Sequence, residues 1–177
     1  MACIKKITDD LAFDCNNPSL IAGIVGVAEA IIINFEDVSS VSATPSTGNA
    51  LITLKAGTKG YTIQCVKNSV QITEAARAND NAPTMLELTA NIKLLSALPV
   101  VTYINGLLSG SFLLAVKTKN NQYYLLGAHS PLEVSDMATD SATDGVTTAT
   151  LKTPDGACGD YRYSITRELY NKLKTKA

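Results

Sequence analysis

Residues 111–127 read SFLLAVKTKNNQYYLLG, and this stretch carries the clearest structural signal in the chain. Two apolar runs, Ser111 to Lys117 and Tyr123 to Gly127, flank the sequence KNN at residues 119–121. β-Branched and aromatic residues favour strands, and asparagine tolerates the left-handed backbone that tight hairpin turns require. The stretch therefore predicts a β-hairpin inside a mainly β fold.

Further strands are expected on both sides of this hairpin, because short apolar or alternating segments lie between turn-forming residues. The first two of these segments should form an opening hairpin, and the last two a closing strand pair around residues 154–156. Two stretches, Ser39 to Gly48 and His129 to Asp144, are predicted to be loops. The expected strands are Ala2 to Ile7, Leu11 to Cys15, Ala30 to Phe35, Ala50 to Lys55, Val100 to Ile104, Val146 to Leu151 and Tyr161 to Thr166.

The longest alternating region runs from Tyr61 to Thr73, and the arm expected from it extends to Ala76. It exceeds the length of an average strand, and its mixed apolar and polar pattern suits pairing with a neighbouring edge strand. The sequence therefore predicts an extended hairpin arm that contributes to a sheet between subunits. The residues assigned to this contact are Tyr61, Ile63, Cys65, Val70 and Ile72.

One segment departs from the strand pattern. Between residues 84 and 98 the apolar side chains recur at the spacing of an amphipathic helix, while Glu87 and Lys93 fall elsewhere. Pro83 offers a start, and Pro99 an end, because proline interrupts helical hydrogen bonding. A helix over about residues 84–98 is predicted to pack on the β core. Its apolar positions are Met85, Leu86, Leu88, Ile92, Leu94 and Leu95.

Length and composition favour a single globular domain over residues 1–177. The chain has 46% hydrophobic and 18% charged residues and a net charge of −1, which argues against binding to a phosphate backbone. The expected fold class is mainly β (α+β), a β-sandwich or barrel with one helix packed on it.

The sequence offers little material for catalysis or for a cofactor. His129 is the sole histidine, and no GxSxG, GxGxxG or GxxxxGK[ST] sequence occurs. Asp136, Asp140 and Asp144 have a four-residue spacing, whereas a calcium loop needs ligands at alternate positions. We expect no enzyme activity, no metal and no cofactor.

The cysteines and the apolar segment Leu20 to Phe35 indicate in which cellular compartment the protein is expected. Four scattered cysteines predict free thiols, with pairing of Cys3 and Cys15 as an alternative. The apolar segment contains Glu29 and is shorter than the about 20 residues of a membrane span. We expect a protein kept in the cytoplasm, with no membrane partner.

Charge is distributed unevenly along the chain. Residues 161–177 contain five Lys and Arg residues against Glu168 alone, whereas residues 133–144 are acidic. A basic end on one copy and an acidic loop on another favour head-to-tail contacts, with a solvated basic terminus as the alternative. The residues assigned to this contact are Asp136, Asp140, Asp144, Lys172 and Lys174.

The order of these segments resembles that of bacteriophage tail tube proteins, of the kind found in phages and prophages of Bacteroidetes-like hosts. The resemblance spans most of the chain and is one of layout. The chain differs in a rather short Ser/Thr loop at Ser39 to Gly48. The segments that carry the resemblance are AIIINFEDV (30–38), GYTIQCVKNSVQITEAA (60–76), TMLELTANIKLLSAL (84–98), YYLLGAHSPLEV (123–134), GVTTATL (145–151) and YRYSITREL (161–169).

The resemblance implies a structural virion protein, assembled in the bacterial cytoplasm. It also implies six copies in a ring, with rings stacking into a conduit through which double-stranded DNA passes without specific binding. Its partners would be further copies and other tail or neck proteins. Two alternatives remain open: a head–tail joining or capsid-decorating protein of a phage, and a small bacterial β-sandwich binding module.

Overall fold

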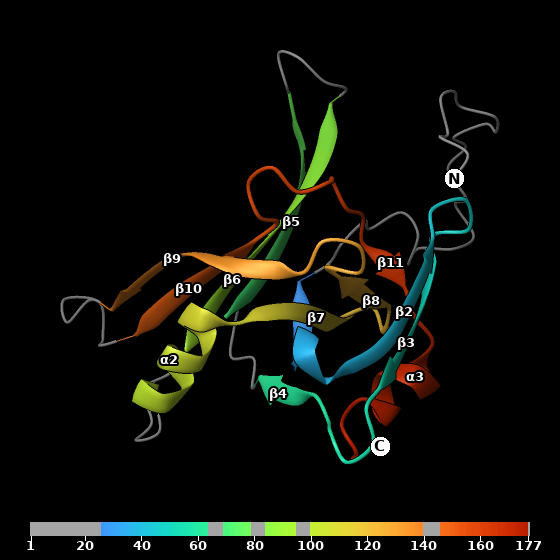
Figure 1. The fold of residues 1–177 in the computed structure, drawn as a ribbon, viewed down its shortest axis with the longest axis horizontal. Helices are drawn as coiled ribbons and strands as arrows, with labels where there is room; N and C mark the ends of the chain where they lie inside the picture. Colours follow the sequence, from blue (N-terminus) through green and yellow to red (C-terminus); the bar gives the residue numbers. More distant parts are fainter. Residues whose placement is uncertain (1–25, 64–68, 79–83, 95–99, 140–145, 177) are drawn as a thin grey trace.

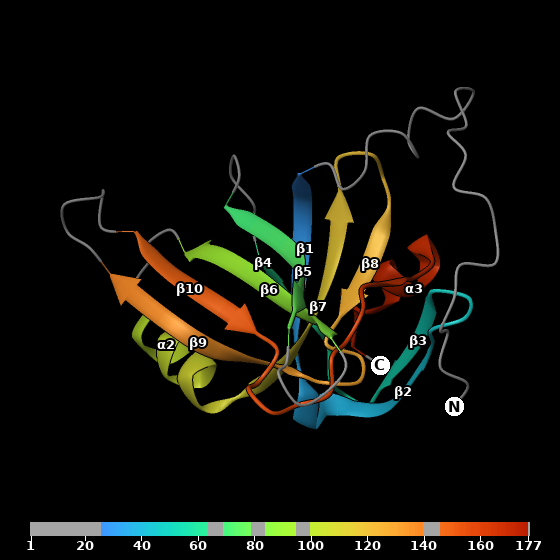
Figure 2. The same ribbon diagram turned by 90° about the horizontal axis from the view of Figure 1, so that it is seen from above.

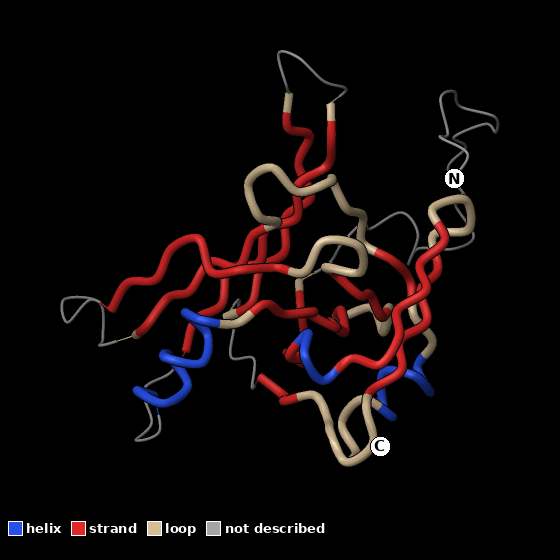
Figure 3. Tube along the Cα trace, in the orientation of Figure 1, coloured by secondary structure: helices blue, strands red, loops and turns tan. Residues whose placement is uncertain are grey.

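The structure is a computed structural model that describes residues 26–63, 69–78, 84–94, 100–139 and 146–176. These residues form one large, mixed, open sheet with two short α-helices, so the fold is mainly β and does not close into a barrel (Figures 1 and 3). The strands are β1 (Val27–Asn34), β2 (Val38–Thr44), β3 (Asn49–Leu54), β4 (Tyr61–Ile63), β5 (Val70–Arg77), β6 (Met85–Leu94), β7 (Ser111–Thr118), β8 (Tyr123–Leu126), β9 (Leu132–Thr139), β10 (Thr147–Lys152) and β11 (Tyr163–Ser164). The helices are η1 (Phe35–Asp37, a 3-10 turn), α2 (Val100–Ser109) and α3 (Arg167–Lys172).

The sheet has a branched order. Its main path runs β2-β3-β11-β8-β7-β9-β10-β6-β5, and β1 joins β7 on one side and β4 on the other. All described pairs are antiparallel except β11 with β3. The path therefore ends at β2 and at β5.

β7 and β1 form the centre of the molecule, and their residues alternate between two hydrophobic cores. Phe112, Leu114 and Val116 enter the first core, whereas Leu113 and Ala115 enter the second core. A strand that is buried on both faces has a continuous run of apolar residues, as residues 112–116 do. Figure 2 shows β1 and β7 in the middle, with β9 and β10 on one side and β2 and β3 on the other.

The central hairpin predicted from residues 111–127 is confirmed. β7 pairs with β8 through Lys117 and Tyr123, which flank the turn. Asn121 has a positive φ of 58°, the conformation for which asparagine is suited. The strands expected at Ala30 to Phe35 and Ala50 to Lys55 are also present, as β1 and β3.

The helix predicted over residues 84–98 is wrong, because residues 85–94 form β6. Leu88, Ala90 and Ile92 are buried in the first core at a spacing of two residues, the period of a strand. Leu86 and Leu94 continue this alternation, so the same leucines fit both periods. Residues 85–94 adopt the strand because their backbone pairs with β5 on one side and with β10 on the other.

The strand expected at Val100 to Ile104 is wrong for a related reason. Residues 100–109 form α2, which follows Pro99 in the sequence. Proline is tolerated in the first turn of a helix, so a proline before an apolar segment is compatible with a helix start as well as with a helix end. Figure 1 shows α2 beneath the β9–β10 hairpin.

The predicted hairpin arm from Tyr61 to Ala76 is not one element. Tyr61–Ile63 pairs with β1 as β4, whereas Val70–Arg77 pairs with β6 as β5. An extended hairpin does exist, but it consists of β5 and β6 and projects at the top of Figure 1.

Three further expectations are corrected. The stretch Ser39 to Gly48 contains β2, and the stretch His129 to Asp144 contains β9. The closing pair is wrong because β10 pairs with β9 and β6, whereas β11 pairs with β8 and β3. The opening hairpin over Ala2 to Cys15 lies outside the described residues.

Candidate assembly surface

β2 is an open edge of the sheet. Its described strand partner is β3, with which it pairs from Val38 to Thr44. A sheet edge carries unpaired backbone N–H and C=O groups, which pair readily with another strand. β2 lies beside β3 at the right of Figure 1.

The side chains of β2 are small and uncharged, so they do not hinder pairing with another strand. The strand reads VSSVSAT, without a charged residue or a proline, and its serines are exposed. Edge strands of proteins that stay monomeric are usually protected by charges, by proline or by bulges. β2 has one irregularity, between Val38 and Ser40, and its register is regular from there to Thr44.

The local sequence explains why β2 forms where it does. Val38, Val41 and Ala43 pack against the second core, which fixes one face of the strand. The turn into β3 is closed by hydrogen bonds from the N–H groups of Thr47 and Gly48 to the carbonyl oxygen of Thr44. Gly48 has a φ of 65°, which glycine adopts without strain.

β5 ends the sheet at its other side, and its charged residues have partners within the chain. Oε2 of Glu74 lies 3.4 Å from Nε of Arg162. The other carboxylate oxygen of Glu74 accepts a hydrogen bond from the backbone N–H of Arg162. The Arg162 guanidinium also lies over the ring of Tyr124, at 5.2 Å. Arg77 is 3.2 Å from Glu87 and 3.2 Å from Asp155.

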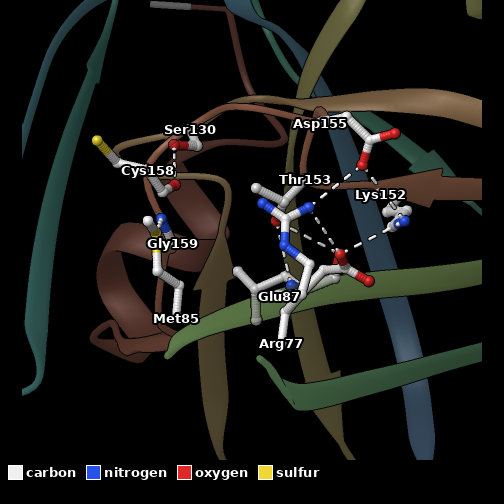
Figure 4. Close-up of polar contacts among 10 residues, drawn as sticks. Arg77, Met85, Glu87, Ser130, Lys152, Thr153, Asp155, Cys158 and Gly159 are labelled. Carbon is white, nitrogen blue, oxygen red and sulfur yellow. Dashed lines mark hydrogen bonds and ion pairs between the residues drawn. The ribbon is translucent and has the colours of Figure 1, made fainter. Parts of the chain in front are cut away.

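The turn end of the β5–β6 hairpin is held by a cluster of four charges, shown in Figure 4. Arg77 and Lys152 both contact Glu87 and Asp155, at distances of 3.2 to 3.7 Å. Two cations and two anions balance each other, so the cluster adds no net charge to this edge. Exposed pairs of this kind stabilise a fold by up to about 1 kcal/mol each.

Residues 153–162, which we call the strap, fasten the β5–β6 hairpin to the rest of the sheet. The N–H of Leu88 donates to the Thr153 hydroxyl, and the N–H of Gly159 donates to the Met85 sulfur (Figure 4). The Ser130 hydroxyl donates to the carbonyl oxygen of Cys158 at 2.6 Å, which joins the strap to the β8–β9 connection. The direction of the hairpin is therefore fixed by the strap.

A buried carboxylate organises the end of the strap. Asp160 is fully buried and accepts hydrogen bonds from the backbone N–H groups of His129, Ser130 and Tyr161. Its neighbour Tyr163 is also fully buried, and its hydroxyl has no hydrogen-bond partner among the described residues. Burial, with the nearby Asp160 charge, raises the pKa of Tyr163 to about 12.

Two shallow hollows lie on the described surface. One, of about 490 Å³, lies between η1 and the end of α2 and includes the half-exposed Phe35. The other, of about 380 Å³, runs beside β2 and includes Leu51, whose side chain is 62% exposed. Within the described part of the chain, no group of three His, Cys, Asp or Glu side chains is placed to hold a metal ion.

The residues assigned to contacts from the sequence are dispersed in the fold. Tyr61 is half-exposed on β4, Ile63 and Val70 are buried in the first core, and Ile72 packs against that core. Asp136 is exposed on β9, in a strand and not in a loop. Cys65, Asp140 and Asp144 lie outside the described residues.

The two lysines assigned to contacts have different surroundings. Lys172 is exposed at the end of α3, whereas Lys174 pairs with Glu29 of the same chain at 2.5 Å. Tyr170 and Leu173 of this basic segment are buried in the second core. The segment is therefore packed against the fold and is not a free tail.

Sequence reasoning missed β2, which forms one open edge of the sheet. A signal was present in the valines at positions 38 and 41, followed by the turn sequence TPSTG (44–48) before β3. Two alternating segments on either side of a short Pro- and Gly-containing turn are typical of a hairpin. The abundance of serine made the segment look like a loop.

Comparison of the chain with known protein families, with curated proteins and with solved structures finds no match. In the described ranges no helix is long and apolar enough to cross a membrane.

Proposed function

We propose that the chain is a structural subunit of a bacteriophage tail. It assembles with further copies into rings, with six copies as the expected number, and the rings stack into a conduit for double-stranded DNA. The observation that carries the proposal is the open, uncharged edge of β2, which presents backbone groups for pairing with another chain. The resemblance of the sequence layout to tail tube proteins supports the same conclusion.

The charge balance supports a conduit that does not retain DNA. The chain has 15 Lys and Arg residues against 16 Asp and Glu residues. Non-specific affinity for DNA comes mostly from Lys and Arg contacts to phosphates. A wall built from this chain therefore lets DNA slide past without tight binding, and the virion tail is the proposed location.

Imaging of the purified protein by negative-stain electron microscopy tests the proposal. Stacked rings or tubes of uniform width are the expected result. Single rings that do not stack favour a neck or head–tail joining protein instead. Particles that remain monomeric at all concentrations would contradict assembly and favour a small binding module.

A matched pair of variants links assembly to β2. In Ser40→Lys/Ser42→Lys, two exposed serines of the edge strand become lysines, which discourage strand pairing. In the control Thr53→Lys, a charge is added at an exposed position of β3, one strand further in. Loss of rings in the first variant and their retention in the control is expected, with unchanged melting temperatures for both.

A further inference from the structure

We infer that the β2 edge of one copy pairs with the β5 edge of the next copy, so that the sheet continues from subunit to subunit. This inference rests on the proposed self-assembly and names the two strands that carry it. β2 and β5 are the two ends of the main strand path. They have similar lengths, seven and eight residues.

The electrostatics of β5 make it a suitable partner for an uncharged strand. Its charged residues, Glu74 and Arg77, are bound to Arg162, Glu87 and Asp155 of their own chain. A neighbouring strand thus meets no uncompensated charge along β5. This matters because placing an unpaired charge in a dry interface is costly.

Exposure along the two strands agrees with this pairing. On β5, Gln71, Thr73 and Ala75 are exposed, and on β2, Ser40 and Ser42 are exposed. These are short or uncharged side chains, which allow two backbones to approach to the about 4.8 Å spacing of a sheet.

Symmetry favours the pairing of β2 with β5 over the pairing of β2 with itself. A two-fold contact between β2 strands satisfies one edge of each subunit and leaves β5 open. A head-to-tail contact satisfies both ends of the main strand path in every subunit, and such contacts close into rings or propagate into filaments. The geometry therefore points to a heterologous contact.

The test uses two variants of the full chain, each blocked at one edge. Ser40→Lys/Ser42→Lys blocks β2, and Thr73→Lys/Ala75→Lys blocks β5. Mass photometry is measured on each variant alone, on an equimolar mixture of the two, and on the unmodified chain. Thr53→Lys serves as the control for added charge, and thermal melting of each variant confirms that it is folded.

The inference predicts that each variant alone is monomeric, whereas the mixture forms dimers and nothing larger. In these dimers the open β5 of one variant meets the open β2 of the other. A β5-blocked variant that assembles like the unmodified chain would overturn the inference, as would a mixture of folded chains without dimers. In either case rings of the unmodified chain would leave the proposed function intact, whereas a monomeric unmodified chain would refute both.

Discussion

The Nζ atom of Lys174 lies 2.5 Å from Oε1 of Glu29, so a charge of the basic C-terminal segment is neutralised within its own subunit. The same ammonium group lies 5.0 Å from the centre of the Tyr170 ring. These contacts hold the C-terminal segment against β1, one of the two central strands. The basic segment therefore contributes to folding, in addition to any contact that its exposed charges make with a neighbour.

Removing residues 172–177 is expected to destabilise the subunit. Leu173 is 2% exposed, and its carbonyl oxygen accepts a hydrogen bond from the N–H of Gly60 at 2.8 Å. Loss of a buried leucine costs about 2 to 5 kcal/mol. Urea unfolding should show this loss, whereas a chain that ends after Thr175 should retain the stability of the full chain.

Leu88→Ala should lower the free energy of unfolding by about 2 to 5 kcal/mol, because Leu88 is fully buried in the first core. Lys93→Ala, at an exposed position of the same strand, should change it by less than about 0.5 kcal/mol. Equal stability of the two variants in urea unfolding would show that β6 does not line the core.

Gly159→Ala should destabilise the strap by about 1 to 3 kcal/mol. A Cβ atom at Gly159 would lie 2.7 Å from Cβ of Met85 and 2.8 Å from the carbonyl oxygen of Leu86. Gly106→Ala is the matched control, because nothing lies within 4 Å of a Cβ there and alanine favours a helix. The midpoints of thermal unfolding should move in opposite directions, and a shared direction would contradict the tight contact of the strap.

Alkaline unfolding should depend on Tyr163. Its pKa is about 12 in the folded chain and about 10 when unfolded, so the folded state holds the proton more strongly. The corresponding stability is fully present below pH 10 and is lost as the pH rises from 10 towards 12. Tyr163→Phe should remove this part of the pH dependence, measured as the free energy of unfolding against pH.

At neutral pH the same substitution should be nearly neutral, within about 0.5 kcal/mol, because the hydroxyl has no hydrogen-bond partner among the described residues. A large loss at pH 7 would reveal a bond to that hydroxyl. Tyr161→Phe, on an exposed neighbour, controls for the general effect of losing a tyrosine hydroxyl.

The open ends of the sheet were only partly predictable from the sequence. The segment around Val70 and Ile72 was identified as a strand, but its partner is β6 and not the strand that begins at Tyr61. The edge of β2 was not identified, because its polarity resembles that of a loop. An edge is a property of the whole sheet order, which no local pattern contains.

Local sequence determined the elements in which one residue pattern fits one structure. The hairpin over residues 111–127 has two apolar runs and an asparagine turn, and β3 alternates strictly between buried and exposed residues. Tertiary structure decided the segments whose apolar residues fit two periods. Leu86, Leu88 and Ile92 suit a helix or a strand, and the backbone hydrogen bonds offered by β5 and β10 stabilise the strand. Such bonds join residues far apart in the chain, so the choice is made only when the sheet forms.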